Sequence, residues 1–146
     1  MTYQPIYPDQ KYSTEEILAS CLGKLHPQAL VGLALFNLGE YFEAHEALEL
    51  AWRAERGPVR EVYRGILQVG VAYYHILKNN YPGALKMLAR STPWLAPYPA
   101  NCRGIDLASF REDAARVEQV LLETAPALLE KFDTSLFKPV KYELER

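Results

Sequence analysis

One segment of the chain, residues 59–79, is apolar almost all the way round when it is drawn as a helix. Its apolar side chains recur on every turn and point in all directions: Val62, Ile66, Leu67, Val69, Val71, Tyr73, Ile76 and Leu77. A helix of this kind has no wide polar face to turn towards water, so other elements have to surround it. The segment therefore predicts the central helix of a helical bundle.

Capping and breaking residues divide the rest of the chain into further helices. Ser13 opens an S-x-x-E capping box, Pro27 and Pro82 suit the first position of a helix, and Asp106 suits an N-cap. No pair of segments has the pattern of two strands that could build a sheet. We therefore predict an all-α fold, a compact helical bundle in one domain over 1–146, with an irregular lead-in over 1–12 and an extended tail over 135–146.

A weak repeat with an offset of 40 residues refines this prediction. Residues 39–48 align with residues 79–88, so that Tyr41 matches Tyr81 and Ala44 matches Ala84. Each copy has a tight turn, a tyrosine and then a small alanine that lets two helices approach closely. This arrangement is typical of tetratricopeptide repeats, although their period is 34 residues. We expect two tetratricopeptide-like helical hairpins.

The charge balance and the apolar content exclude several classes of partner. Sixteen basic and 18 acidic residues are spread along the chain without a basic patch, which argues against nucleic acid. The apolar runs are too short to span a bilayer, and the first residues lack the pattern of a secretory signal. Cys21 and Cys102 lie far apart in no metal-like spacing. We therefore expect a cytoplasmic location, no membrane association and two free thiols.

The helix expected over residues 41–55 carries the candidate site. At about 100° per residue, Tyr41, His45 and Trp52 fall on one apolar stripe and Glu49 flanks it, whereas Glu46 points towards water. An imidazole on a core-facing stripe needs a polar partner, since an unpaired buried polar group is costly. The stripe thus predicts a buried polar site.

The central helix has a polar stripe that could face this site. Arg64, Gln68 and His75 share one side of it. We expect His45, Glu49, Gln68 and His75 to converge, with Arg64 and Trp52 at the rim.

Three interpretations of this cluster stay open. The first is a hydrogen-bonded core network that only fixes the register of the helices. The second is a pocket for a protein or small-molecule partner, lined with aromatic side chains. The third is a divalent metal site of a hydrolase-like enzyme, with His45, Glu49 and His75 as ligands and Glu46 as a candidate base. Exposed aromatic side chains could equally make a homo-oligomer interface.

These residues also resemble a known family. The stretches that carry the resemblance are Phe36–Trp52, Tyr63–Gln68, Ala72–His75 and Asn79–Ala84, with a proline-rich loop over Tyr98–Asp106. They are similar to the domain-of-unknown-function 309 family of small all-helical proteins. The resemblance implies an all-α fold with the Tyr-Phe-Glu-Ala-His-Glu helix at its heart. It implies no activity, because the family has no settled function.

The family motif includes the candidate site residues on the two expected helices: His45, Glu46, Glu49, Trp52, Gln68 and His75. It departs at Arg64, where the motif leads us to expect glutamine. We predict a binding or interaction module with a polar pocket as the first choice, and the metal-dependent enzyme as the alternative.

Overall fold

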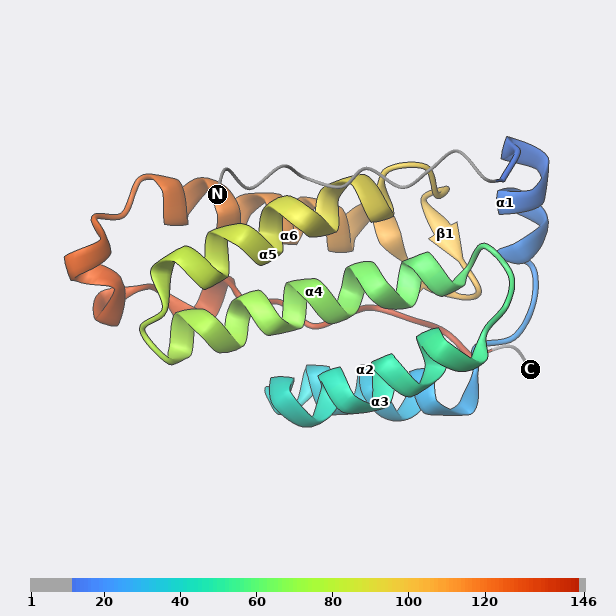
Figure 1. Ribbon diagram of the computed structural model, residues 1–146, viewed down its shortest axis with the longest axis horizontal. Coiled ribbons are helices and arrows are strands. Elements are labelled where there is room, and N and C mark those ends of the chain that lie inside the picture. Colours follow the sequence, from blue (N-terminus) through green and yellow to red (C-terminus); the bar gives the residue numbers. More distant parts are fainter. Residues whose placement is uncertain (1–11, 145–146) are drawn as a thin grey trace.

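The computed structural model describes residues 12–144, and they form a mostly helical molecule (Figure 1). This confirms the predicted all-α class. In chain order the elements are α1 (Thr14–Ser20), α2 (Pro27–Asn37), α3 (Tyr41–Ala54), α4 (Arg60–Leu77), α5 (Tyr81–Leu95), β1 (Asn101–Cys102), β2 (Ile105–Asp106), α6 (Leu107–Leu122) and the 3₁₀ turns η1 (Pro126–Lys131) and η2 (Thr134–Leu136).

The helix expected at the centre of the bundle is α4, which lies between α3 and α5. It buries nine residues, among them Val62, Ile66 and Val69, which have no exposed surface. Two glycines let the neighbouring helices come close. A Cβ atom at Gly65 would lie 2.5 Å from Leu95 Cγ, and one at Gly32 would lie 2.6 Å from Leu48 Cγ. These contacts fix where α5 packs on α4 and where α2 packs on α3.

The two copies of the sequence repeat occupy equivalent places. Gly39 and Asn79 both have a left-handed backbone, with φ of 80° and 59°, directly before α3 and α5. Both turns also close in the same way, because the N–H of Glu40 donates to the carbonyl of Leu35, and that of Asn80 to His75. The repeat therefore encodes two helical hairpins, α2–α3 and α4–α5, whose tetratricopeptide-like geometry stays a prediction.

The loop after α5 differs from the expectation that the chain has no strand pair. Asn101 and Cys102 pair with Asp106 and Ile105 in a hairpin of two residues per strand. Its turn places Gly104 at a φ of 87°, and a Cβ atom there would lie within contact of the Glu143 backbone. A hairpin this short carries no alternating pattern, which explains why the sequence did not reveal it.

The tail is less superficial than its sequence indicated. Val140 is buried, and its backbone N–H and C=O both bond to the Asn37 side chain, at 2.7 and 2.9 Å. Phe137 stacks on Tyr73 of the central helix with ring centroids 4.4 Å apart. The tail thus closes the bundle along α2 and α4.

The expectation of two free thiols is wrong. Cys21, directly after α1, and Cys102, in β1, form a disulfide although they are 81 positions apart in the sequence. Both sulfur-bearing residues are buried, and the N–H of Arg103 donates to the Cys21 carbonyl at 2.7 Å. The fold brings these distant segments together, and no local spacing in the sequence could have predicted the disulfide.

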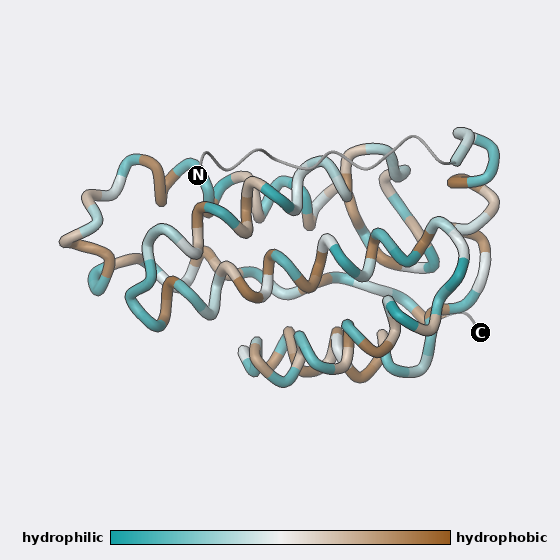
Figure 2. The backbone as a smooth tube through the Cα atoms, viewed as in Figure 1, coloured by the Kyte–Doolittle hydropathy of each residue, from teal (hydrophilic) through white to brown (hydrophobic). Residues whose placement is uncertain are grey.

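Apolar residues recur along each helix, as the brown segments in Figure 2 show, but they are interrupted by polar ones. No helix within residues 12–144 is both long and apolar enough to cross a membrane.

Candidate functional site

The site is centred on Arg64, whose guanidinium lies between two tryptophans. Its Cζ atom is 4.3 Å from the centroid of the Trp52 ring and 4.1 Å from that of Trp94. Three neighbouring helices each supply one of these side chains: α3, α4 and α5. A guanidinium stacks on indole faces through cation–π attraction, so the two rings hold the group in one plane. A quarter of the Arg64 side chain is still exposed to solvent.

Glu61 and Arg60 complete the surroundings of Arg64. Trp52 Nε1 donates to Glu61 Oε1 at 3.2 Å, and Arg64 Nη1 lies 3.5 Å from Glu61 Oε2. Arg60 Nε donates to the Trp52 carbonyl, and its Cζ atom is 4.9 Å from the Trp52 ring. Burial lowers the pKa of Arg64, while Glu61 opposes that shift and Arg60 adds to it. The guanidinium stays charged at physiological pH.

Glu49, which precedes Trp52 by one turn of α3, forms a pair with His45. Their Nε2 and Oε2 atoms are 3.5 Å apart, and a third of each side chain is exposed. Glu49 also accepts a bond of 2.6 Å from Arg53. The buried stripe of α3 consists of Tyr41, Ala44, Ala47, Leu48 and Ala51. His45 therefore lies beside the core rather than inside it, and the expectation of a buried imidazole is wrong.

Gln68 lies on α4 one turn after Arg64, and its side-chain oxygen is buried. Within the described residues this oxygen accepts no hydrogen bond. An unpaired buried acceptor costs about 1–3 kcal/mol.

His75 is placed at the far end of α4. It is 11 residues after Arg64, which corresponds to about 16 Å along a helix. Its Nδ1 atom is 3.3 Å from the Asn80 amide nitrogen, and burial lowers the pKa of the imidazole. The structure therefore brings together His45 with Glu49 and Trp52 with Arg64, whereas His75 has separate neighbours.

The expected metal ligands do not form a metal site in the part of the chain that the structure describes. Over residues 12–144, no group of three or more His, Cys, Asp or Glu side chains is placed to hold a metal ion. Glu46, the candidate base, is exposed on the outer side of α3. This geometry gives the hydrolase-like alternative no support.

Sequence reasoning missed Trp94. The residue stands near the end of α5, outside the stretches considered for the site. A signal was present, because Trp94 and Trp52 are the chain's two tryptophans, and the 40-residue repeat places α5 in the position of α3. Arg60 was also missed, one turn before Arg64 on the same helix.

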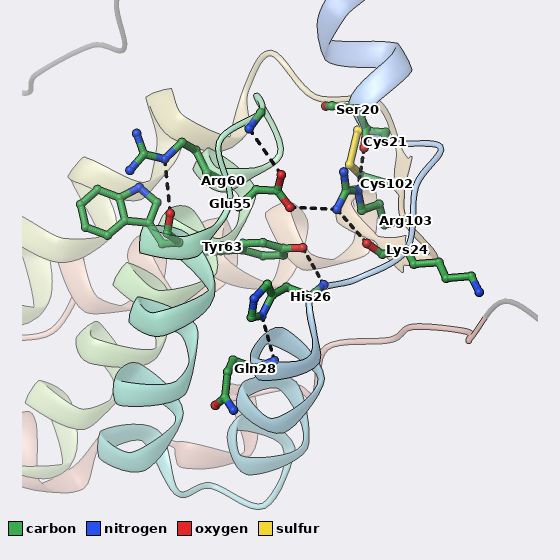
Figure 3. A network of polar contacts seen from close by, with 12 residues as sticks. Ser20, Cys21, Lys24, His26, Gln28, Glu55, Arg60, Tyr63, Cys102 and Arg103 are labelled. Carbon is green, nitrogen blue, oxygen red and sulfur yellow. Dashed lines mark hydrogen bonds and ion pairs between the residues drawn. A yellow bond between two sulfur atoms is a disulfide. The ribbon is translucent and has the colours of Figure 1, made fainter.

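A second polar network holds the disulfide end of the molecule (Figure 3). Arg103 donates to the carbonyls of Ser20 and Lys24 at 2.6 and 2.7 Å, and it bonds to Glu55 at 3.1 Å. The hydroxyl of Tyr63 accepts from the backbone N–H of His26. With its guanidinium occupied in this way, Arg103 holds α1 and the β hairpin against the end of α3.

Two proteins from bacteria are similar to this chain. A protein of Aquifex aeolicus (strain VF5), described as uncharacterized, is 29% identical over 87 residues, which are 59% of this chain and 25% of that protein. The uncharacterized protein YpuF of Bacillus subtilis (strain 168) is 32% identical over 110 residues, or 71% of this chain and 58% of YpuF. The chain thus spans about a quarter of the length of the Aquifex protein and somewhat over half of the length of YpuF. No solved structure gives a significant match.

The family comparison identifies the segment that contains the site. Residues 30–87 match the family described as "Domain of unknown function (DUF309)". The matched range runs from α2 into α5 and includes His45, Glu49, Trp52 and Arg64. It confirms the resemblance drawn from the Tyr-Phe-Glu-Ala-His-Glu helix. The chain therefore contains a segment, from α2 into α5, that is similar to the DUF309 family.

Proposed function

We propose that this chain is a protein-interaction module that binds an acidic segment of a partner protein on the face formed by α3, α4 and α5. The observation that carries the proposal is the position of Arg64 between Trp52 and Trp94, with a quarter of its side chain exposed to solvent. The two indoles hold this cation in advance of binding, so less conformational entropy is lost when a carboxylate arrives.

The charges around Arg64 favour an anion. Glu61, which is largely buried, pairs with Arg64, Arg60 lies over the Trp52 ring, and Glu49 is engaged by Arg53. This leaves a net positive charge beside two aromatic rings. An arginine fork binds a carboxylate through two parallel hydrogen bonds, and indole faces add apolar contact area.

The two other interpretations of the site have less support. A core network that only fixes helix register would not need a partly exposed cation at its centre. The metal-dependent enzyme lacks a ligand set among residues 12–144. A binding role uses Arg64 and both tryptophans as the geometry presents them.

Intrinsic fluorescence tests the proposal directly, because the chain's two tryptophans both lie against Arg64. The probe is a hexapeptide of alternating glutamate and aspartate, titrated at low salt into the full chain. We expect a saturable change in tryptophan emission that weakens as salt is added. A peptide of glutamine and asparagine is the neutral control.

Two variants make the test specific. Arg64→Gln removes the charge but keeps a side chain that can lie between the indoles, and it should weaken peptide binding about 10- to 100-fold, as expected for the loss of a charge-assisted hydrogen bond. Arg116→Gln removes an exposed arginine from α6 and should leave binding unchanged. Equal binding by the wild type and by Arg64→Gln, or no saturable signal, would overturn the proposal.

We also propose that the chain works in the cytoplasm, as its sequence led us to expect. Thiols are kept reduced there, so this location places the buried Cys21–Cys102 pair under reducing conditions. Fractionation of cells that express the protein tests the location directly. Recovery in the cytosolic fraction supports the proposal, and recovery outside that fraction would overturn it.

A further inference from the structure

The outer face of α2 is apolar and exposed. Pro27, Val31, Ala34 and Leu38 follow one another at intervals of three and four residues, and all four are exposed, Leu38 to 75% and Val31 to 47%. The opposite stripe of the helix is buried against the bundle: Ala29, Gly32, Leu33 and Phe36. Both faces of α2 are therefore apolar.

No charged residue occurs between Pro27 and Asn37. A surface helix normally turns charged or polar side chains towards water, and a helix that is apolar all round is normally covered. The central helix α4 has such a pattern and is covered by α3 and α5. The outer stripe of α2 has no such cover in the part of the chain that the structure describes, as its exposure shows.

We propose that a second copy of this chain covers α2, and that the two α2 helices pack antiparallel across a twofold axis. The proposal is independent of the acidic-segment site, which lies on another face. In this arrangement Val31 of each copy packs on Ala34 of the other, and Leu38 packs on Pro27. The small side chain of Ala34 beside the axis lets the two helix backbones approach closely.

The charges at the ends of α2 favour the same pairing. Lys24 precedes the helix, whereas Glu40 and Glu43 follow it, and all three are exposed. An antiparallel pair brings the basic end of one helix to the acidic end of the other, and it also opposes the two helix dipoles. A parallel pair would bring like charges together at both ends. An acidic or basic partner would find no matching charge along α2 itself.

The length of the stripe sets the strength of this dimer. The 11 residues of α2 extend over about 16 Å, which is too short for the roughly 800 Å² per partner that a standard stable interface buries. We therefore expect dissociation in the micromolar range.

Sedimentation of the full chain over a range of concentrations tests the proposal. The weight-average mass should rise from 16.6 kDa towards twice that value as the concentration approaches about 100 μM. Leu38→Glu places a charge in the stripe at a residue that is largely exposed, so the fold is kept, and it should weaken the dimer at least about 10-fold. Leu122→Glu changes an exposed leucine at the end of α6 and should leave the dimer unchanged.

A cross-linking experiment checks the orientation. The single variant Ala34→Cys should become a covalent dimer with a short bis-maleimide, while Leu122→Cys should not, since the native cysteines are bonded to each other. A monomer at every concentration would overturn the proposal. A dimer that persists in Leu38→Glu would also overturn it, and so would a dimer in which Ala34→Cys does not cross-link. Either result would place the contact between the copies on another face.

Discussion

The link between Cys21 and Cys102 offers the sharpest test of the fold, because its contribution can be worked out from the sequence separation. The bond closes a loop of 81 residues. In the chain-entropy description, a loop of this length removes about 15 cal/mol/K from the unfolded chain, so the disulfide stabilises the fold by about 4.5 kcal/mol at 25 °C. This is a large share of the 5–15 kcal/mol that is typical of the stability of a domain.

Urea unfolding of the oxidised and the reduced chain measures this contribution. With a slope of about 2 kcal/mol/M, reduction should lower the unfolding midpoint by about 2 M. The double variant Cys21→Ala/Cys102→Ala should unfold near the midpoint of the reduced chain, whether or not a reductant is present. A thiol count of zero in the native oxidised protein is expected, since no free cysteine is present.

Two results would refute the reasoning. A thiol count of two in protein prepared without reductant would show that the pair does not bond. A midpoint that moves by less than about 0.5 M on reduction, with the thiols shown to be reduced, would mean that the unfolded chain gains no freedom from opening the loop.

Three further outcomes follow from the packing and the charges. Gly65→Ala should destabilise the fold by about 1–3 kcal/mol, measured by urea unfolding, because its Cβ would lie 2.5 Å from Leu95 Cγ; an unchanged midpoint would show that α5 shifts freely on α4. Glu46→Ala should change stability by less than about 0.5 kcal/mol, since Glu46 is exposed, and a large loss would mean that the orientation of α3 is different. Burial lowers the pKa of His75, so the unfolded chain binds more protons near pH 6 and stability should fall as the pH drops below the ordinary histidine value of about 6.5. His75→Asn should flatten that fall in thermal unfolding at pH 5 to 8, and an unchanged slope would assign it to another group.

Local signals explain why so many element boundaries could be predicted. The capping box at Ser13 is present with both of its hydrogen bonds, and Asp106 caps α6 by accepting from the Ser109 N–H. Each of these signals needs only the next three residues. The central helix was equally visible, because a pattern that is apolar all round has few possible surroundings.

Contacts between distant segments were not visible in the sequence. Cys21 and Cys102, or Asn37 and Val140, carry no mark that assigns them to each other. The same limit explains why only part of the candidate site could be predicted. His45 and Glu49 share a helix and were paired correctly, whereas Trp94 joins Arg64 only after α5 has packed on α4.

The Cys21–Cys102 disulfide and the hydrogen bonds between Asn37 and Val140 join segments that lie far apart in the sequence. This has a consequence for folding during synthesis on the ribosome. The hairpins α2–α3 and α4–α5 are built from neighbouring segments, so each can form as it emerges. Asn37 must wait for Val140, which is 103 residues further along the chain. During translation the early hairpins therefore lack the contacts that residues 137–140 make with them. The apolar side chains that these residues cover stay accessible to chaperones until residues 137–140 have emerged.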